Sequence, residues 1–555
     1  MNQLRTPEAS PLLASPPARG EFGTHVSHYV EPLREATYDE EYDSFPDPRP
    51  SRAVEDDVLP ETSALGRTLT WRSCFILVIS RVIGSGIFAT PGTIIKEVGS
   101  PGLSLLLWLI GGVVAACSLA VCLEYGSMLP RSGGDKVYLE FTYRRPRLLA
   151  SIVIAVHALL LGLTASNCII FSQYVLFALD RPEASAFERK GLAAGLLVVV
   201  TFIHVVFPRF GVRTQNLFGW LKIAVTGFMI LSGLYVVLFH QQTGSLVSAS
   251  AQTGSTWDNV WEGSVWSWSA LSTAIFKVFY SYAGLDNMVN VMNEVKNPVR
   301  TLKSVGTTAL ATACALYLLI NVAYLSVVPL DEIKSSGELI AALFFERLFG
   351  PRLGRTILPL AVALSAAGNV MVVSFSMARL KQEIARQGII PYGDFLSSTR
   401  PFGSPLGGFL LHIVPSFLVI VLPPSKRVYS FILELEQYPA QILSLALAFG
   451  LLILRYKRPD LKRPFKAWLF AVAVKIAMSL TLLVTALVPP HDMFEGGIFY
   501  ATYAIAGTSV LLLGVLYWWV WTILLPRWKG YRLEEETEVL KDGTSITRMV
   551  HTPSP

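Results

Sequence analysis

The chain has 555 residues, of which 52% are hydrophobic and 15% are charged, and its formal net charge is +6 at pH 7. About a quarter of the residues in a soluble globular domain are charged, so this composition excludes that class and indicates a protein embedded in a lipid bilayer. Because the basic residues gather in alternate loops, membrane topology accounts for the positive charge, and no nucleic-acid partner is expected.

Polar tails are predicted on both sides of an apolar region. Residues 1–68 are rich in Pro, Ser, Asp and Glu without a helical period, which predicts a disordered cytosolic tail and no cleavable signal peptide. Residues 69–528 form the predicted transmembrane transporter domain, and residues 529–555 a C-terminal cytosolic tail that is solvated rather than folded. About twelve apolar segments are long enough to cross the bilayer as helices. They are 71–95, 103–128, 149–179, 191–208, 214–239, 268–292, 304–328, 356–381, 406–422, 429–454, 466–488 and 497–525.

Charge in the loops predicts the orientation of these helices. Lys and Arg occur in loops such as 131–147, 294–303 and 455–466, whereas 241–263 and 489–497 contain neither. Under the positive-inside rule this asymmetry places both termini in the cytosol. Basic side chains on the cytosolic side are candidates for ion pairs with the acids at 124, 135 and 294; they are Lys296, Arg300, Arg379 and Arg386.

The first apolar segment is interrupted by the sequence IGSGIFATPG at residues 83–92. A helix in lipid cannot leave backbone groups unpaired, so unwinding is tolerated only where the freed groups line a polar cavity. Gly84 and Gly86 permit close backbone approach, and Ser85 between them adds a hydroxyl group. The break therefore predicts a binding site inside the membrane, with a glycine-packed helix crossing as the alternative.

The two half-helices of this break suit the two ends of a zwitterion. The amides of Ser85, Gly86 and Ile87 begin the outer half-helix, whose positive dipole end suits a carboxylate. Carbonyl groups near Val82 and Ile83 end the inner half-helix and suit an ammonium group.

A second interruption, FYSYAGLDN at residues 279–287, lies about 200 residues later, and paired breaks are typical of secondary transporters with inverted repeats. Tyr280, Ser281 and Ala283 are expected to supply further carbonyl groups. Tyr280 either closes over the substrate as an outer gate or packs within the bundle. Leu285 is expected to begin a pocket for an unbranched or thioether side chain.

Polar residues in other apolar segments complete the predicted site. Ser166 and Asn167 either line the cavity or make ordinary interhelical hydrogen bonds. Lys222 is expected to bind carbonyl groups of the first broken helix and a hydroxyl such as that of Ser374, in place of a sodium ion, or else to snorkel to the interface. Asp286 carries a coupling proton or caps the following half-helix.

Two acidic residues in the tenth segment are further candidates for binding a coupling proton. Glu434 and Glu436 lie at the start of this segment beside Tyr438, so a proton role is considered for them.

Three motifs occur in the order of one known family: VIGSGIFATPGTIIKEVGSPGLSLLLW, EYGSMLPRSGGDKVYL and SYAGLDNMVNVMNEVKNP. With them the chain resembles the L-type amino acid transporter family of the amino acid/polyamine/organocation (APC) superfamily, and most of all its fungal methionine permeases. The resemblance implies an α-amino acid held between helices 1 and 6. Val82, Gly84, Ser85 and Gly86 match the helix 1 substrate backbone. Tyr280 takes the place of the gating aromatic residue, with Ser281 and Ala283 beside it, and Lys222 that of the lysine replacing the second sodium ion.

The expected fold is an all-α membrane protein with a LeuT-like 5+5 inverted repeat, broken helices 1 and 6, and a peripheral pair of helices. The expected function is a plasma-membrane permease that imports neutral L-amino acids, methionine first, by sodium-independent proton symport. An exchanger or uniporter of broader specificity and a non-translocating nutrient receptor are the alternatives. No enzyme, cofactor or metal site is expected, because no His/Asp/Glu cluster falls within the helices. In the family that the chain resembles, animal members that join a single-span glycoprotein use a cysteine in the loop between helices 3 and 4. Loop 180–190 contains none, so the resemblance implies no disulfide-linked heavy chain.

Overall fold

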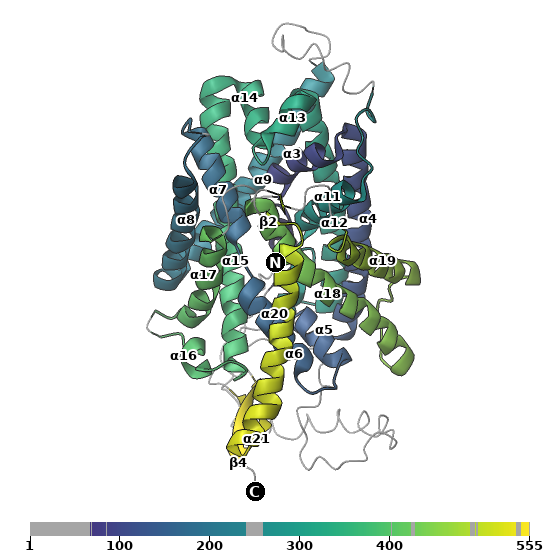
Figure 1. The fold of residues 1–555 in the computed structure, drawn as a ribbon, viewed down its shortest axis with the longest axis vertical. Coiled ribbons are helices and arrows are strands. Elements are labelled where there is room, and N and C mark those ends of the chain that lie inside the picture. Colours follow the sequence, from purple (N-terminus) through teal and green to yellow (C-terminus); the bar gives the residue numbers. More distant parts are fainter. Residues whose placement is uncertain are drawn as a thin grey trace, which may run out of the picture. The chain divides into compact units, whose positions relative to one another are not determined.

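Helices make up nearly all of the regular structure (Figure 1). The computed structural model describes residue 67 and residues 69–84, 86–181, 183–239, 259–400, 402–422, 428–488, 494–495, 498–539 and 545–553. All of these residues fall in one unit, Arg52–Pro555. The predicted N-terminal tail, residues 1–68, lies almost wholly outside the described residues.

The chain order of the elements is as follows. The helices of the first half are α2 (Trp71–Val82), α3 (Gly86–Val98), α4 (Pro101–Met128), α5 (Asp135–Thr142), α6 (Leu149–Leu161), α7 (Ala165–Ala178), α8 (Ala186–Val206) and α9 (Pro208–Phe239). Those of the second half are α11 (Trp268–Tyr282), the 3-10 helix η4 (Asn287–Glu294), α12 (Pro298–Val327), α13 (Leu330–Ser336), α14 (Ile340–Arg352), η5 (Leu353–Ile357), α15 (Leu358–Arg386), α16 (Gly393–Ser397), α17 (Leu406–Val421), α18 (Val428–Lys457), α19 (Leu469–Thr485), α20 (Thr502–Trp519), η6 (Val520–Leu524) and α21 (Leu525–Lys529). Two antiparallel strand pairs complete the list: β1 (Phe494–Glu495) with β2 (Ile498–Phe499), and β3 (Tyr531–Val539) with β4 (Ser545–Pro553).

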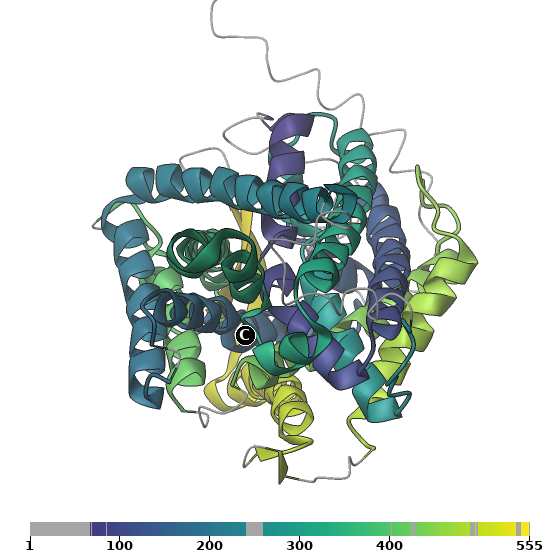
Figure 2. The same ribbon diagram turned by 90° about the horizontal axis from the view of Figure 1, so that it is seen from above.

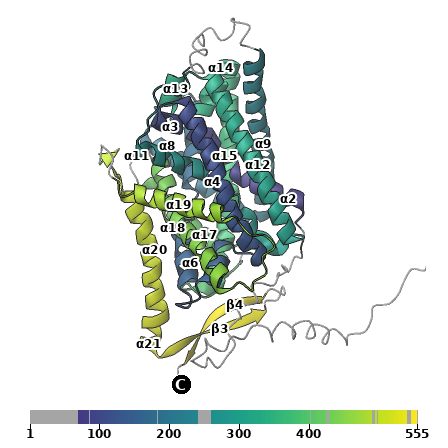
Figure 3. The same cartoon turned by 90° about the vertical axis from the view of Figure 1, so that its right-hand side faces the viewer.

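Every one of the predicted apolar segments contains helix, which confirms an all-helical membrane protein. Within the described residues, nine helices are long and apolar enough to cross a bilayer, and shorter apolar helices occupy Leu406–Val421 and Leu469–Thr485. The short helices α13 and α14 lie at one end of these helices, and α21 with strands β3 and β4 lies at the opposite end (Figures 1 and 3). Seen from above, the yellow-green and yellow helices α19 and α20 lie at the edge (Figure 2).

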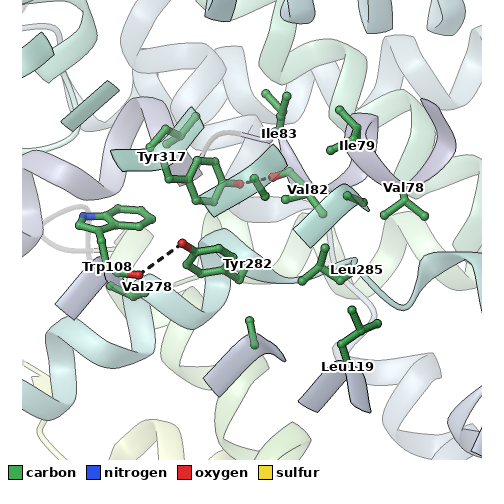
Figure 4. Packing of buried hydrophobic residues seen from close by; sticks show 14 of the residues in the cluster. Val78, Ile79, Val82, Ile83, Trp108, Leu119, Val278, Tyr282, Leu285 and Tyr317 are labelled. Atoms are coloured by element: carbon green, nitrogen blue, oxygen red, sulfur yellow. Dashed lines mark hydrogen bonds between the residues drawn. The ribbon is translucent and has the colours of Figure 1, made fainter. Parts of the chain in front are cut away.

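An aromatic cluster forms the core beside the two predicted breaks (Figure 4). The ring of Trp108, on α4, lies 5.3 Å from that of Tyr317 and 6.1 Å from that of Tyr282. The hydroxyl group of Tyr282 donates a hydrogen bond to the carbonyl oxygen of Trp108 at 3.3 Å. The rings bury apolar surface while the hydroxyl groups of Tyr282 and Tyr317 find buried acceptors, so the cluster fixes the relative positions of α4, α11 and α12.

The carboxylate of Glu124, near the end of α4, is fully buried and bonded to the end of α18 and to the segment that follows it. Arg455 donates a hydrogen bond from Nε at 3.0 Å and another from its terminal nitrogen, and the amide of Ala467 donates a third at 2.8 Å. Nε of Arg463 lies 3.6 Å from Oε1 of Glu124. The predicted pairing of Glu124 with basic residues at 296, 300, 379 and 386 is wrong, because these nearer donors occupy both carboxylate oxygens.

The C-terminal segment differs from the solvated tail that its acidic run predicts. Strands β3 and β4 form a hairpin whose register pairs Tyr531 with Pro553. Leu533 and Met549 pack against the buried cluster around Trp521, and the amide of Met549 donates a hydrogen bond to the carbonyl oxygen of Gln387 at 3.1 Å. Leu533 and Met549 give the hairpin one apolar face that can be buried. The acidic run from Glu534 to Glu536 makes this face difficult to recognise in the sequence.

Candidate functional site

The first helix is broken where the sequence predicts it. α2 ends at Val82 and α3 begins at Gly86, with non-helical backbone between them. A Cβ atom at Gly84 would lie 2.6 Å from Nδ2 of Asn369, and one at Gly86 would lie 2.8 Å from Oγ of Ser281. At Gly86 the backbone of Ser281 also lies close, with its Cα atom at 3.0 Å, so glycine allows α11 to approach the first break there; at Gly84 a larger residue would displace the side-chain amide of Asn369.

The second predicted break is also confirmed, and it contacts the first. α11 ends at Tyr282, residues 283–286 form turns, and the 3-10 helix η4 follows. Gly284 has a φ angle of +105°, which residues with a side chain rarely adopt. A Cβ atom at Gly284 would lie 2.4 Å from Cγ of Arg81, on α2. The two interruptions therefore meet in space.

One hydroxyl group on α12 joins the two breaks (Figure 4). Tyr317 is fully buried, and its hydroxyl oxygen lies 2.8 Å from the carbonyl oxygen of Val82 and 2.6 Å from that of Ser281. Its single proton can be donated to either carbonyl group. The sequence does not identify this residue: a tyrosine in the apolar run ALYLLIN indicates a buried hydrogen bond, but not its partners.

A pocket of about 40 Å³ lies where the breaks meet. Eight of the residues predicted to bind substrate line it: Val82, Gly84, Gly86, Ser166, Asn167, Tyr280, Ser281 and Ala283. This volume has room for only a few water molecules. The surrounding helices must therefore move apart before a molecule as large as an amino acid can enter.

Four other residues predicted at the site do not line this pocket. Ile83 and Ile87 are buried in the core beside the first break. Leu285 lines a different and larger cavity, because the turn at Gly284 carries it to the other side of the second break from Ser281. Ser85 lies outside the described residues.

Ser166 and Asn167, on α7, line the pocket and also bond to neighbouring helices. Oγ of Ser166 lies 3.1 Å from the hydroxyl oxygen of Tyr280. Nδ2 of Asn369, on α15, donates a hydrogen bond to Oδ1 of Asn167 at 3.1 Å. The sequence leaves two alternatives open, cavity lining and interhelical hydrogen bonding, and both are true of these residues.

A third break, between α6 and α7, is not predicted by the sequence. The carbonyl oxygen of Gly162 lies 3.3 Å from Nζ of Lys381 and 3.1 Å from Nδ1 of His412, so buried side chains bind the backbone freed there. The next residue, Leu163, lines the pocket. A lone glycine in the run LLLGLTASN is a weak signal, because single glycines are tolerated inside helices.

Two opposite charges face the pocket. Arg81, near the end of α2, and Glu436, on α18, both line it. The sequence predicts neither as a substrate ligand and raises Glu436 only for a proton role. When both are ionised, the pocket carries no net charge from side chains. A charge inside an apolar segment is the signal that points to these residues, since such groups are costly away from a wet cavity.

Lys222, on α9, is fully buried and donates a hydrogen bond from Nζ to the carbonyl oxygen of Ser80 at 3.0 Å. Its burial excludes the snorkelling alternative, and its acceptor lies in the first broken helix as predicted. The hydroxyl group of Ser374 is buried on α15. No hydrogen bond between Ser374 and Lys222 is found among the described residues.

Asp286 precedes η4, but its side chain makes no capping hydrogen bond. The predicted capping role is wrong because the carboxylate faces the larger cavity instead. In the part of the chain that the structure describes, no three His, Cys, Asp or Glu side chains gather in a group able to hold a metal ion.

Residues 69–511 match the amino acid permease family. The chain is 33% identical to the low-affinity methionine permease of Saccharomyces cerevisiae over 494 residues, which cover 88% of each chain. It is 32% identical to the high-affinity methionine permease of the same yeast over 478 residues, which cover 85% of this chain and 82% of that one. The human b(0,+)-type amino acid transporter 1 is 26% identical over 438 residues, which cover 78% of this chain and 84% of that one.

We expect Gly86→Ala to abolish amino acid uptake in a protein that still folds, because the added methyl group would overlap Oγ of Ser281 at 2.8 Å. Uptake of labelled amino acids and thermal unfolding of the purified protein measure the two effects. Gly195→Ala, on α8, is the matched control, since no atom lies within 4 Å of the position that its Cβ would take. Normal uptake by Gly86→Ala would contradict the assignment of this pocket.

We expect Tyr317→Phe to lower the free energy of unfolding by about 1–3 kcal/mol and to reduce uptake, because buried carbonyl groups lose a donor. Thermal unfolding and uptake are measured together. Tyr324→Phe is the control on the same helix, because its hydroxyl contacts one half-helix alone, at 3.3 Å from the carbonyl oxygen of Ile87. Equal losses in the two variants would show that joining the breaks has no special effect.

Proposed function

Because the chain belongs to the amino acid permease family, we propose that it imports neutral L-amino acids, methionine first, across the plasma membrane by alternating access. Members of this family are transporters and not enzymes. Methionine is proposed because two relatives at 33% and 32% identity are methionine permeases by name. The chain's helices support a multi-pass membrane protein.

The observation that carries this proposal is the pocket at the meeting point of two broken helices. The amino end of α3, at Gly86, offers backbone N–H groups and a positive dipole end to a carboxylate. The carboxyl ends of α2 and α11 offer carbonyl oxygens to an ammonium group. When both are ionised, Arg81 and Glu436 balance each other in charge, which suits a zwitterion whose side chain is neutral.

Hydrogen bonds within the first break refine which groups remain for the substrate. The carbonyl oxygen of Val82 accepts a hydrogen bond from the amide of Gly84 at 2.8 Å, and a second one when the hydroxyl group of Tyr317, also at 2.8 Å, donates its proton to Val82 rather than to Ser281. These two donors use both of its lone pairs. We therefore assign Val82 to joining the breaks, and the ammonium group to carbonyl groups of the other break residues that line the pocket, such as Gly84 and Ala283.

Tyr280 is proposed as the gate over the bound substrate. It lines the pocket, lies 3.1 Å from Ser166 across it, and packs edge-on against the ring of Tyr429 at 6.5 Å. Breaking the contact with Ser166 would let α11 and α7 separate around the ring. Both neighbours come from other helices, so movement of Tyr280 is linked to movement of the bundle.

The fold is proposed to be a LeuT-like repeat of five plus five helices. The positions of the breaks support it, since they fall in the first and sixth apolar segments. The outlying position of α19 and α20 fits a peripheral pair (Figure 2). The uneven distribution of Lys and Arg in the loops supports cytosolic termini.

Uptake of radiolabelled methionine into a transport-deficient host tests the function. We expect accumulation that rises as the external pH falls, with strong competition by unlabelled methionine, weaker competition by leucine and cysteine, and none by arginine or a polyamine. A hydrophobic pocket separates neutral side chains by only about 1–3 kcal/mol per methylene, whereas a cationic side chain would add an unbalanced charge. Binding without uptake would favour a receptor, and uptake only against internal amino acid would favour an exchanger.

We expect methionine uptake to be unchanged when choline replaces sodium, because the ammonium group of Lys222 already binds the carbonyl oxygen of Ser80. Lys222→Met should abolish uptake in both media, since it leaves that buried carbonyl group without its donor. Lys462→Met, at a loop position, is the control. A strict requirement for sodium in the unmodified protein would refute this role of Lys222.

A further inference from the structure

The larger cavity lies on the other side of the second break from the candidate substrate pocket. It has a volume of about 230 Å³ and is bounded by α4, α5, α18, α19 and the break after α11. Tyr280 and Ser281 line the substrate pocket, whereas Tyr282 and Gly284 line the larger cavity, and Ala283 lines both. The end of α11 and the break that follows it therefore lie between the two spaces, so a shift of this segment alters both.

Charged groups from three elements face the larger cavity. Asp135 comes from α5, Asp286 from the end of the break, and Lys475 from α19. With all three ionised their formal charge is −1, and one added proton makes it zero. The remaining polar lining is uncharged; it comprises Ser118, Cys122, Tyr125 and Tyr138 from α4 and α5, Tyr282 from α11, Gln437, Gln441 and Ser444 from α18, and Ser479 from α19.

Proton binding is chemically accessible at this cluster. Asp135 and Asp286 are both exposed residues that line the cavity, so water reaches them there. The elements around the cavity remove bulk water from the carboxylate of Asp135, on α5 between two spans. This desolvation, and next the repulsion from Asp286, raise the pKa of Asp135 from its ordinary value to about 6, while Lys475 opposes the shift. Tyr138 is 1% exposed and lines the same cavity, and its buried hydroxyl has no hydrogen-bond partner among the described residues. It is a neutral donor beside groups that exchange protons.

We infer that the cluster of Asp135, Asp286 and Lys475 is the site that binds the proton coupled to substrate transport. This inference rests on the proposed function. A proton from the aqueous phase bonds to a carboxylate oxygen of Asp135 or Asp286 and later returns to water on the other side, so no electron transfer and no other reactant is involved. Together with a zwitterion it moves one positive charge in each cycle.

The contacts explain how this site and the substrate pocket are linked. Asp286 is two residues from Gly284, whose backbone lies against the side chain of Arg81, and Arg81 lines the substrate pocket. Protonation of the acids weakens their attraction to Lys475 and so frees the break from α19. Substrate bound at Ala283 acts on the same segment from the opposite side. Binding of the proton thus favours the arrangement of the break that binds substrate, and binding of substrate favours the arrangement that binds the proton.

Proteoliposomes that contain the full chain separate coupling from substrate recognition. Methionine counterflow requires binding and alternating access but no proton gradient, whereas accumulation driven by an imposed pH gradient requires coupling. We expect Asp135→Asn and Asp286→Asn to retain counterflow and to lose gradient-driven accumulation. Asp135→Glu should restore the accumulation. Glu140→Gln, on the same short helix but outside the cavity lining, is the matched control and should behave as the unmodified protein.

Lys475→Gln gives a second readout that a merely structural role would not produce. Without the ammonium group of Lys475, the carboxylates of Asp135 and Asp286 bind a proton more readily. The external pH that gives half-maximal uptake should therefore shift upward. An unmodified protein without methionine counterflow would overturn the proposed function itself. If the unmodified protein shows counterflow and gradient-driven accumulation, then accumulation by both Asp→Asn variants, or an unshifted pH profile for Lys475→Gln, would overturn this inference alone.

Discussion

The constraint on which this structure depends is the need to bond backbone groups that broken helices release inside an apolar bundle. Water cannot serve them there, so each break persists only where other parts of the chain supply donors and acceptors. Tyr317 does this for two breaks at once, through carbonyl groups 199 residues apart in sequence, at Val82 and Ser281. Its position on α12 makes that helix the common support of both interruptions.

The paired breaks give one short segment two functional faces. The chain leaves the helical path after Tyr282, and residues from Tyr280 to Asp286 face two different spaces. An intact helix would also present two faces, but its backbone groups would be bonded internally and unable to bind a ligand. Under the proposed function, the turn at Gly284 provides both the polar backbone for the substrate and the link to the charges in the neighbouring cavity.

Much of this architecture can be predicted from the sequence, because apolar runs and Gly-rich interruptions are local signals. Such signals predict the helices and the breaks at 83–92 and 279–287. A lysine inside an apolar run likewise predicts the contact of Lys222 with the first broken helix. The partners of Glu124 could not be predicted, because they lie more than 300 residues away and several basic loops offer equally plausible charges. The break near Gly162 could not be predicted either, because a buried lysine and histidine from distant helices, rather than local sequence, stabilise it.

Two sets of helices meet at the pocket, and each is bonded within itself. α12 supports the breaks in the first and sixth apolar segments through Tyr317, whereas α15 and α17 support α7 through Lys381, His412 and Asn369. The pocket residues of α7 are therefore bonded to α15, and the first break, α3 and α11 are bonded to α12. Separation of the two sets would open the pocket without disturbing the bonds inside either set.

The hydrogen bonds between the sets are few and individually weak. The hydroxyl of Tyr174 donates to the carbonyl oxygen of Phe88 at 2.7 Å, and Ser166 lies 3.1 Å from the hydroxyl oxygen of Tyr280. A typical hydrogen bond contributes about 1 kcal/mol net. Opening the pocket thus costs a few kcal/mol on these bonds, an amount that the differential binding of a small ligand can supply. A closed pocket of this kind can therefore be emptied and refilled by ligand binding without unfolding any helix.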